Sequence, residues 1–183
     1  AFVQAEGVSI FRGRRSLEAN FELWAESEAA ASRLKARLLE QSVAFVAPER
    51  MHAVRMAAGI PSVPVEIGPA DLPGEGGLVG DAVSLQKGCY LGQEVVSRMY
   101  NVGSPQRALF RLSGSGAVPV CPVALYQETK KVGELRSAFS DGDRWQGVAL
   151  LKTRFAAVGE VLTHGASRAT VEGLFSAVQE GAE

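Results

Sequence analysis

A cysteine bracketed by two glycines is the residue of this sequence best suited to chemistry. Cys89 lies in the octapeptide Lys-Gly-Cys-Tyr-Leu-Gly-Gln-Glu, which runs from Lys87 to Glu94. Gly88 and Gly92 permit backbone angles, or a close approach of a ligand, that a residue with a side chain would resist. We therefore interpret the octapeptide as a candidate reactive turn.

The thiol of Cys89 is expected to lie just before a helix, because residues 93–100 place apolar side chains at helical spacing. Exposed N–H groups at a helix N-terminus and the cation on Lys87 would favour the thiolate, which is the reactive form of cysteine. The carboxylate of Glu94 would oppose it. The net effect stays open, and a buried, unreactive cysteine is the alternative.

Metal ligands are too few and too scattered for a resident metal. Cys121 lies between a valine and a proline, 32 positions after Cys89, and is interpreted as structural. His52 and His164 have no partner at the spacing of a zinc site. Two distant cysteines cannot complete the four-thiolate ligand set of an iron-sulfur cluster. A cluster handled by this chain would need ligands from another molecule.

Composition excludes several classes of protein. The chain has 183 residues, 19 of them basic and 20 acidic, so its formal net charge is -1 and direct general nucleic-acid binding is not expected. Two cysteines cannot build a disulfide-rich secreted scaffold. No apolar run reaches the roughly 18 residues of a membrane span, and the N-terminus lacks the pattern of a signal peptide. We expect a soluble, cytoplasmic protein that does not enter a membrane.

The first part of the chain predicts short strands followed by helices. Alternating runs at residues 8–11 and 21–24 predict two antiparallel strands. Residues 27–41 then show helical spacing, with a serine able to cap the helix at its start. The apolar, β-branched run at residues 43–46 predicts a short buried strand.

A second predicted helix, residues 48–59, places an arginine among apolar side chains. Arg55 shares a helical face with Met51 and Val54. A guanidinium held there needs a carboxylate, a carbonyl or an anionic ligand. A structural salt bridge with an acid such as Glu66 and a role in ligand binding are equally open.

The remainder of the chain predicts a connecting segment and a barrel. Residues 60–77 are rich in proline and glycine and are expected to drape across the first unit and lead into the octapeptide. Six strand-like runs follow, at residues 108–112, 123–126, 132–139, 145–151, 159–162 and 169–174. Their spacing predicts a small antiparallel β-barrel, so we expect an α+β fold with domains at residues 1–103 and 104–183.

The octapeptide is similar to the signature of the YgfZ family, relatives of the glycine cleavage T-protein and of mitochondrial iron-sulfur assembly factors. Residues 54–61 resemble the family's Arg-x-Glu-Ala-Gly-Ile-Pro segment, residues 81–84 the lead-in to the signature, and residues 132–138 a strand of its barrel. The resemblance implies a partial T-protein-like, folate-binding α+β domain followed by a small antiparallel β-barrel. It also implies a function in maintaining certain iron-sulfur enzymes, including the enzymes that methylthiolate transfer RNA.

The resemblance further implies a cofactor and partners. The cofactor would be tetrahydrofolate or a derivative, and the partners iron-sulfur proteins or their assembly machinery. Cys89 would act as a reactive thiol with Lys87 and Gln93 beside it. The residues expected to bind the folate are Arg55, Tyr90, Glu94, Arg98 and Arg107. The arginines could meet the carboxylate tail of a folate because a guanidinium matches a carboxylate bidentately; a solvated surface or salt bridges are the alternative.

The sequence also departs from the family pattern. Ala57 stands where the family's arginine-containing segment has a glutamate, which removes an acidic group that could bind a pterin. The first half of the family's folate-binding region has no counterpart here, so the chain is expected to be N-terminally short and its folate pocket incomplete. The uncovered strand edge or apolar face near Val8 would favour a homodimer.

Three functions follow. The leading one is a folate-binding accessory protein that supports iron-sulfur cluster assembly or repair through Cys89, and that is not a self-sufficient enzyme. The second is a folate-dependent aminomethyltransferase like the T-protein, which the resemblance disfavours because the T-protein lacks the cysteine signature and uses an acidic residue of the missing region. The third is an interaction module that binds no ligand.

Overall fold

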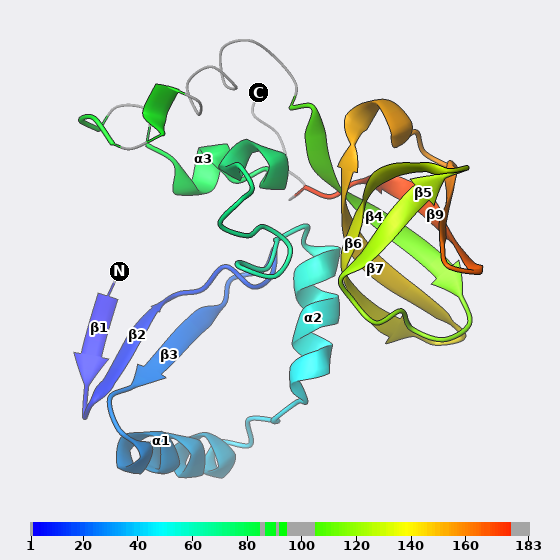
Figure 1. Cartoon of the computed structure of the whole chain (residues 1–183). Helices are drawn as coiled ribbons and strands as arrows, with labels where there is room; N and C mark the ends of the chain where they lie inside the picture. The colour runs from blue at the N-terminus through cyan, green and yellow to red at the C-terminus, as the bar shows by residue number, and fades with distance from the viewer. Residues whose placement is uncertain (1, 85–86, 91, 95–104, 177–183) are drawn as a thin grey trace. The chain divides into compact units, whose positions relative to one another are not determined.

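The computed structural model describes residues 2–84, 87–90, 92–94 and 105–176 (Figure 1). It divides into two compact units, Ala1–Ile60 and Pro61–Glu183. The structural division therefore falls at residue 60, because the residues from 61 onward cluster with the barrel. The predicted domains 1–103 and 104–183 stay a prediction.

A three-stranded antiparallel sheet forms the first unit together with two helices. Its strands are β1 (Phe2–Ala5), β2 (Val8–Arg12) and β3 (Phe21–Ala25), in the order β1-β2-β3. The strands predicted at residues 8–11 and 21–24 are confirmed, whereas β1 was not predicted. Glu6 and Gly7 join β1 to β2 with φ values of 53° and 75°, as a two-residue hairpin turn with both central residues at positive φ requires.

The first predicted helix is confirmed. Helix α1 spans Glu28–Glu40, and the side chain of Ser27 caps it by accepting a hydrogen bond of 3.2 Å from the amide of Ala30. The strand predicted at residues 43–46 is wrong. Residues 43–47 have no regular structure, and Val43, Phe45 and Val46 are about half exposed, at 44%, 53% and 55%. An apolar β-branched run becomes a strand only where a neighbouring strand pairs with it.

Helix α2 spans Pro48–Ala57 and begins at its proline, as predicted. Arg55 and Met56 are its buried residues. The predicted apolar face is wrong in part, because Met51 and Val54 are 40% and 38% exposed. Arg55 is nevertheless buried, at 5% exposure.

An apolar groove of about 440 Å³ runs between α1 and the sheet of the first unit. Val8, Ile10 and Leu23 line it from the strands, and Leu34 and Leu38 from α1. The face of the sheet is therefore incompletely filled by α1. A homodimer that would cover such a face stays a prediction.

The second unit begins with a segment that we name the strap, residues 61–77, which contains the short 3-10 helix η1 (Pro73–Gly76) and precedes helix α3 (Val79–Ala82). Its buried acids Glu66 and Glu75 hydrogen-bond to strands of the barrel. The expectation that this segment drapes across the first unit stays a prediction.

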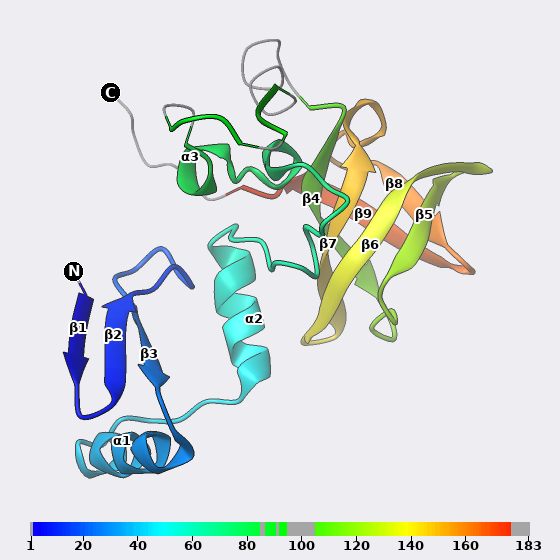
Figure 2. The ribbon, with the colours of Figure 1, turned by 60° about the vertical axis from the view of Figure 1, so that its left-hand side comes forward.

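The barrel consists of six antiparallel strands, and all six predicted runs are confirmed. The strands are β4 (Arg107–Ser115), β5 (Val123–Gln127), β6 (Lys130–Asp141), β7 (Arg144–Lys152), β8 (Val161–His164) and β9 (Ser167–Leu174). They close in the order β4-β7-β6-β5-β8-β9, which leaves no unpaired sheet edge (Figures 1 and 2). A second 3-10 helix, η2 (Thr153–Phe155), follows β7. The fold class, α+β with an antiparallel barrel, is confirmed.

Alternate residues of the strands fill the barrel interior. Leu125, Val132, Leu135 and Trp145 are all fully buried there. Trp145 lies directly opposite Gly114 on β4, and a Cβ atom at Gly114 would be 2.5 Å from Cε2 of the indole. A glycine is therefore needed at position 114 to admit the largest side chain of the core.

Candidate functional site

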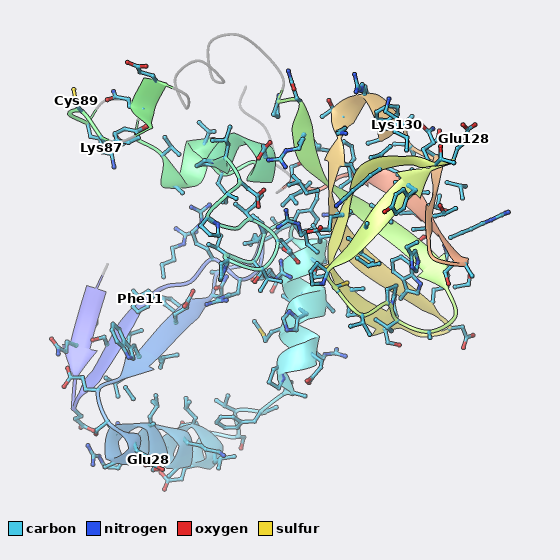
Figure 3. The ribbon with its side chains drawn as sticks, viewed as in Figure 1. Phe11, Glu28, Lys87, Cys89, Glu128 and Lys130 are labelled. Carbon is cyan, nitrogen blue, oxygen red and sulfur yellow. The ribbon has the colours of Figure 1, made fainter. Side chains whose placement is uncertain are left out.

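The octapeptide forms a turn after α3, of which the structure describes residues 87–90 and 92–94. The amide of Lys87 donates to Oγ of Ser84 over 3.2 Å, and the amide of Gln93 donates to the carbonyl of Tyr90 over 3.2 Å. Gly92 has a φ of 86°, a conformation that favours glycine. The free thiol of Cys89 is exposed, and Figure 3 shows its sulfur directed outward from the turn.

The ammonium group of Lys87 lies over the ring of Tyr90, with Nζ 4.7 Å from the ring centroid. This cation–π contact keeps a positive charge within the turn that carries Cys89. The hydroxyl of Tyr90 is buried and has no hydrogen-bond partner within the part of the chain that the structure describes. The turn therefore contains an exposed nucleophile, a nearby cation and a buried polar atom that no described residue satisfies.

The helix predicted at residues 93–100 lies largely outside the described residues. Gln93 and Glu94 have helical backbone, so Cys89 precedes a helical start by four residues. Glu94 is exposed. Arg98 lies outside the described residues. The roles expected for these residues stay predictions.

Arg55 is held by a backbone carbonyl. Its Nη1 donates to the carbonyl oxygen of Ile60 over 2.6 Å, just beyond the end of α2. A carbonyl is one of the three kinds of partner that a buried guanidinium was expected to need. A role of Arg55 in binding folate stays a prediction.

Arg107 takes part in a network of ion pairs whose acidic partners, Asp71 and Glu75, the sequence did not indicate. Its Nε and Nη2 donate to the two carboxylate oxygens of Glu75 over 2.8 Å and 2.9 Å, and Nη2 also lies 3.5 Å from Oδ1 of Asp71. The hydrogen bond to Glu75 raises the pKa of the Arg107 guanidinium, against the desolvation that lowers it. The salt-bridging alternative considered for Arg107 is therefore observed, while its role toward folate stays a prediction.

A second arginine extends this network. Arg136 on β6 donates from Nη1 and Nη2 to the carboxylate of Asp71 over 3.3 Å and 3.4 Å, and its Nε lies 3.0 Å from Oε1 of Glu134. Nearby, the hydroxyl of Ser137 hydrogen-bonds to the carboxylate of Glu66. These pairs join residues 65 and 71 positions apart, so no local pattern could reveal them. The one available signal was the presence of acids within an otherwise apolar strap.

The structure places the other cysteine and a histidine in protected positions. Burial raises the pKa of the Cys121 thiol to about 11, which agrees with its interpretation as structural. His164 packs edge-on against Trp145, with ring centroids 5.7 Å apart, and burial lowers its pKa. Among the described residues, no group of three or more His, Cys, Asp or Glu side chains could hold a metal ion.

None of the helices in the described ranges combines the length and the apolar character that crossing a bilayer requires.

Comparison with known proteins identifies two relatives in sequence, and no family model matches the chain. Over 107 residues, the chain is 35% identical to the mouse (Mus musculus) protein "Iron-sulfur cluster assembly factor IBA57, mitochondrial"; the match covers 56% of this chain and 30% of that protein. Over 77 residues, it is 38% identical to the "tRNA-modifying protein YgfZ" of Serratia proteamaculans (strain 568), covering 38% of this chain and 23% of that protein. The match thus spans less than a third of either curated relative.

A solved structure shares the fold over nearly the whole chain. The glycine cleavage system aminomethyltransferase T from Bartonella henselae superposes with a TM-score of 0.74, over 93% of this chain and 50% of that chain. At 18% sequence identity this likeness shows the fold alone. In sequence this chain is therefore similar to these two relatives over part of its length, and in fold it is similar to the aminomethyltransferase structure over most of its length.

Proposed function

We propose that this chain is an accessory protein that supports iron-sulfur cluster assembly or repair, and that it acts through the thiol of Cys89. The observation that carries the proposal is the exposed free thiol on the glycine-bracketed turn of the octapeptide. The two sequence relatives, named as an iron-sulfur cluster assembly factor and a tRNA-modifying protein, support the choice of process.

The chemistry of a single thiol restricts what Cys89 can do. A thiolate binds iron, but one thiolate is a quarter of the four-cysteine set that usually holds a cluster. The described residues supply no further cluster of ligands, so a cluster would be cargo, bound mainly by the partner protein. Cys89 would lose its proton on binding iron and replace one ligand of that cluster.

The proposal also includes a folate cofactor bound by this chain. Its candidate ligands are Arg55, Tyr90, Glu94, Arg98 and Arg107. The buried hydroxyl of Tyr90, which no described residue satisfies, fits a polar ligand such as a pterin. Arg107 fits less well, because Glu75 occupies two of its donors. When bound, tetrahydrofolate supplies a carrier of one-carbon groups.

The test compares two cysteine variants in a host that lacks the native protein. Cys89→Ser should lower the activity of dependent iron-sulfur enzymes, whereas Cys121→Ser, which removes the half-buried thiol, should leave it unchanged. The protein level of each variant is measured in the same cells, so that a loss of activity is separated from a loss of folded protein. Full activity with Cys89→Ser at normal protein level would rule the proposal out.

The folate part is tested separately by calorimetric titration of the whole chain with tetrahydrofolate. Saturable binding that Tyr90→Phe weakens would support it, because this variant removes only the hydroxyl. If no binding occurs, the cofactor is rejected and the ligand-free alternative is favoured, while the role of Cys89 stands on its own test. Formation of methylene-tetrahydrofolate with a complete partner system would instead support the aminomethyltransferase alternative.

A further inference from the structure

A charged groove of about 220 Å³ is lined by residues of β4, β6 and β7 on the outer wall of the barrel. These strands run side by side in the order β4-β7-β6 (Figure 2). Five charged side chains line it, Arg107, Lys131, Glu134, Arg136 and Lys152. The remaining lining comes from Val132, Gly133 and Leu150. We name this feature the barrel groove.

Cations outnumber acids at the barrel groove. Its four cationic side chains meet three carboxylates among the described residues, those of Glu134 in the lining and of Asp71 and Glu75 from the strap. The carboxylates of Asp71 and Glu75 are only 4% and 7% exposed, so they lie behind the arginines that they bind. An excess of one positive charge is thus concentrated in a chain whose formal net charge is -1.

Among the described residues, the cations of the groove have few close hydrogen-bond partners beyond the strap carboxylates. Lys152 donates to the carbonyl of Lys131 over 3.3 Å and forms no ion pair with any described residue. Lys131 Nζ lies 3.7 Å from Glu134, which is longer than a hydrogen bond. The Nε atom of Arg136 is buried and, within the described ranges, has no hydrogen bond, although Glu134 lies 3.0 Å away as an ion-pair partner.

Two of the cations are also held in place. Glu75 binds Arg107 through two parallel hydrogen bonds, and Asp71 binds Arg136 through two more. Their guanidinium groups therefore lose little further freedom when a ligand arrives, which is the usual benefit of preorganisation. The two lysines add mobile ammonium groups with free N–H donors.

We infer that the barrel groove binds a small oxyanion of the phosphate class. Lysine acts on a phosphate as a point charge with several donors, and arginine adds directed N–H groups. The volume is below the 300–1,000 Å³ that is typical of sites for drug-sized ligands, so it suits one phosphate group and not a whole nucleotide or folate. This site does not involve Cys89 and goes beyond the function proposed above.

The test is calorimetric titration of the whole chain with inorganic phosphate in a buffer of low ionic strength. Lys152→Gln should weaken binding about three- to tenfold, and Glu134→Gln should strengthen it by a similar factor, because the first removes an attractive charge and the second a repulsive one. Lys130→Gln is the matched control. Lys130 neighbours Lys131 on β6, but its Nζ lies 4.8 Å from the ring centroid of Phe155 and it does not line the groove.

The two opposite shifts make the outcome decisive. The inference is overturned if phosphate does not bind saturably, if Lys130→Gln weakens binding as much as Lys152→Gln, or if Glu134→Gln fails to strengthen it. Acetate is titrated in parallel, and binding as tight as that of phosphate would overturn the phosphate class. Circular dichroism checks that each variant is folded; if Lys152→Gln unfolds the chain, Lys131→Gln carries the test, since Lys131 is 56% exposed.

Discussion

Glu75 and Arg107 form a bidentate ion pair across 32 residues of sequence, with Nε–Oε1 and Nη2–Oε2 distances of 2.8 Å and 2.9 Å. Glu75 lies in η1 of the strap and Arg107 begins β4 of the barrel. This pair joins the strap, which leads into α3 and the octapeptide, to the β-barrel. The carboxylate is almost completely buried, so it depends on Arg107 for compensation of its charge.

Replacing this carboxylate should loosen the strap. Glu75→Gln keeps the shape of the side chain but removes its charge. We expect the free energy of unfolding to fall by about 1–2 kcal/mol. The loss stays in this range because a partly exposed charge-assisted pair is weaker than a fully buried one. Urea unfolding followed by the fluorescence of Trp145 measures the loss. A Trp24→Phe background removes the other tryptophan, which is 72% exposed.

Glu6→Gln is the control for that experiment. Glu6 pairs with Arg37 at 2.8 Å, but both side chains are about two-thirds exposed, so the loss should be below about 1 kcal/mol. Equal losses in the two variants would show that burial of Glu75 adds nothing to the strength of its pair.

A methyl group at position 114 should destabilise the barrel. Gly114→Ala would place Cβ against the indole of Trp145, and overpacking of this kind costs about 1–3 kcal/mol of unfolding free energy. Thermal unfolding measures it. Gly80→Ala is the control, because Cβ there meets open space, and its melting temperature should be unchanged or slightly higher. An unchanged melting temperature for Gly114→Ala would contradict the observed packing.

His164 should make stability depend on pH. Burial lowers the pKa of His164 in the folded state, so the unfolded chain takes up a proton first as the pH falls. Its contribution to stability is therefore fully present above the ordinary histidine value of about 6.5 and is lost as the pH falls toward the lower folded value. Urea unfolding between pH 7.5 and 5 measures the decrease, and each pH unit corresponds to at most about 1.4 kcal/mol for one group.

His164→Gln removes the titrating ring and should flatten this part of the pH profile. His52→Gln is the matched control, because His52 is exposed on α2 and its replacement should leave the profile unchanged. A profile that keeps its full slope in His164→Gln would show that other groups cause the decrease.

The two cysteines should react at very different rates. Cys89 is exposed, whereas burial raises the pKa of Cys121 to about 11 and so keeps it as a thiol near neutral pH. Labelling with a disulfide reagent at pH 8 should modify the Cys121→Ser variant at least about 100-fold faster than the Cys89→Ser variant, since only the thiolate attacks. Labelling of the two variants at comparable rates would contradict the assigned environments.

Local features of the sequence were sufficient to predict several elements. The six barrel strands follow from alternating runs separated by turn residues, and α1 from its helical spacing and from Ser27 at its start. The octapeptide identified the turn of Cys89 and the family resemblance. In each case the information lies within one short stretch, because side-chain periodicity and capping act over a few residues.

Only the tertiary structure decided which distant parts meet. The run at residues 43–46 has strand-forming residues but pairs with no described strand. In contrast, β1 pairs with β2 through a tight turn, although its own sequence did not predict a strand. The strap is joined to the barrel by Glu75–Arg107 and Asp71–Arg136, and the barrel groove arises from cations on three strands. Such contacts join residues that are dozens of positions apart in the chain. They therefore produce no periodic pattern in the sequence.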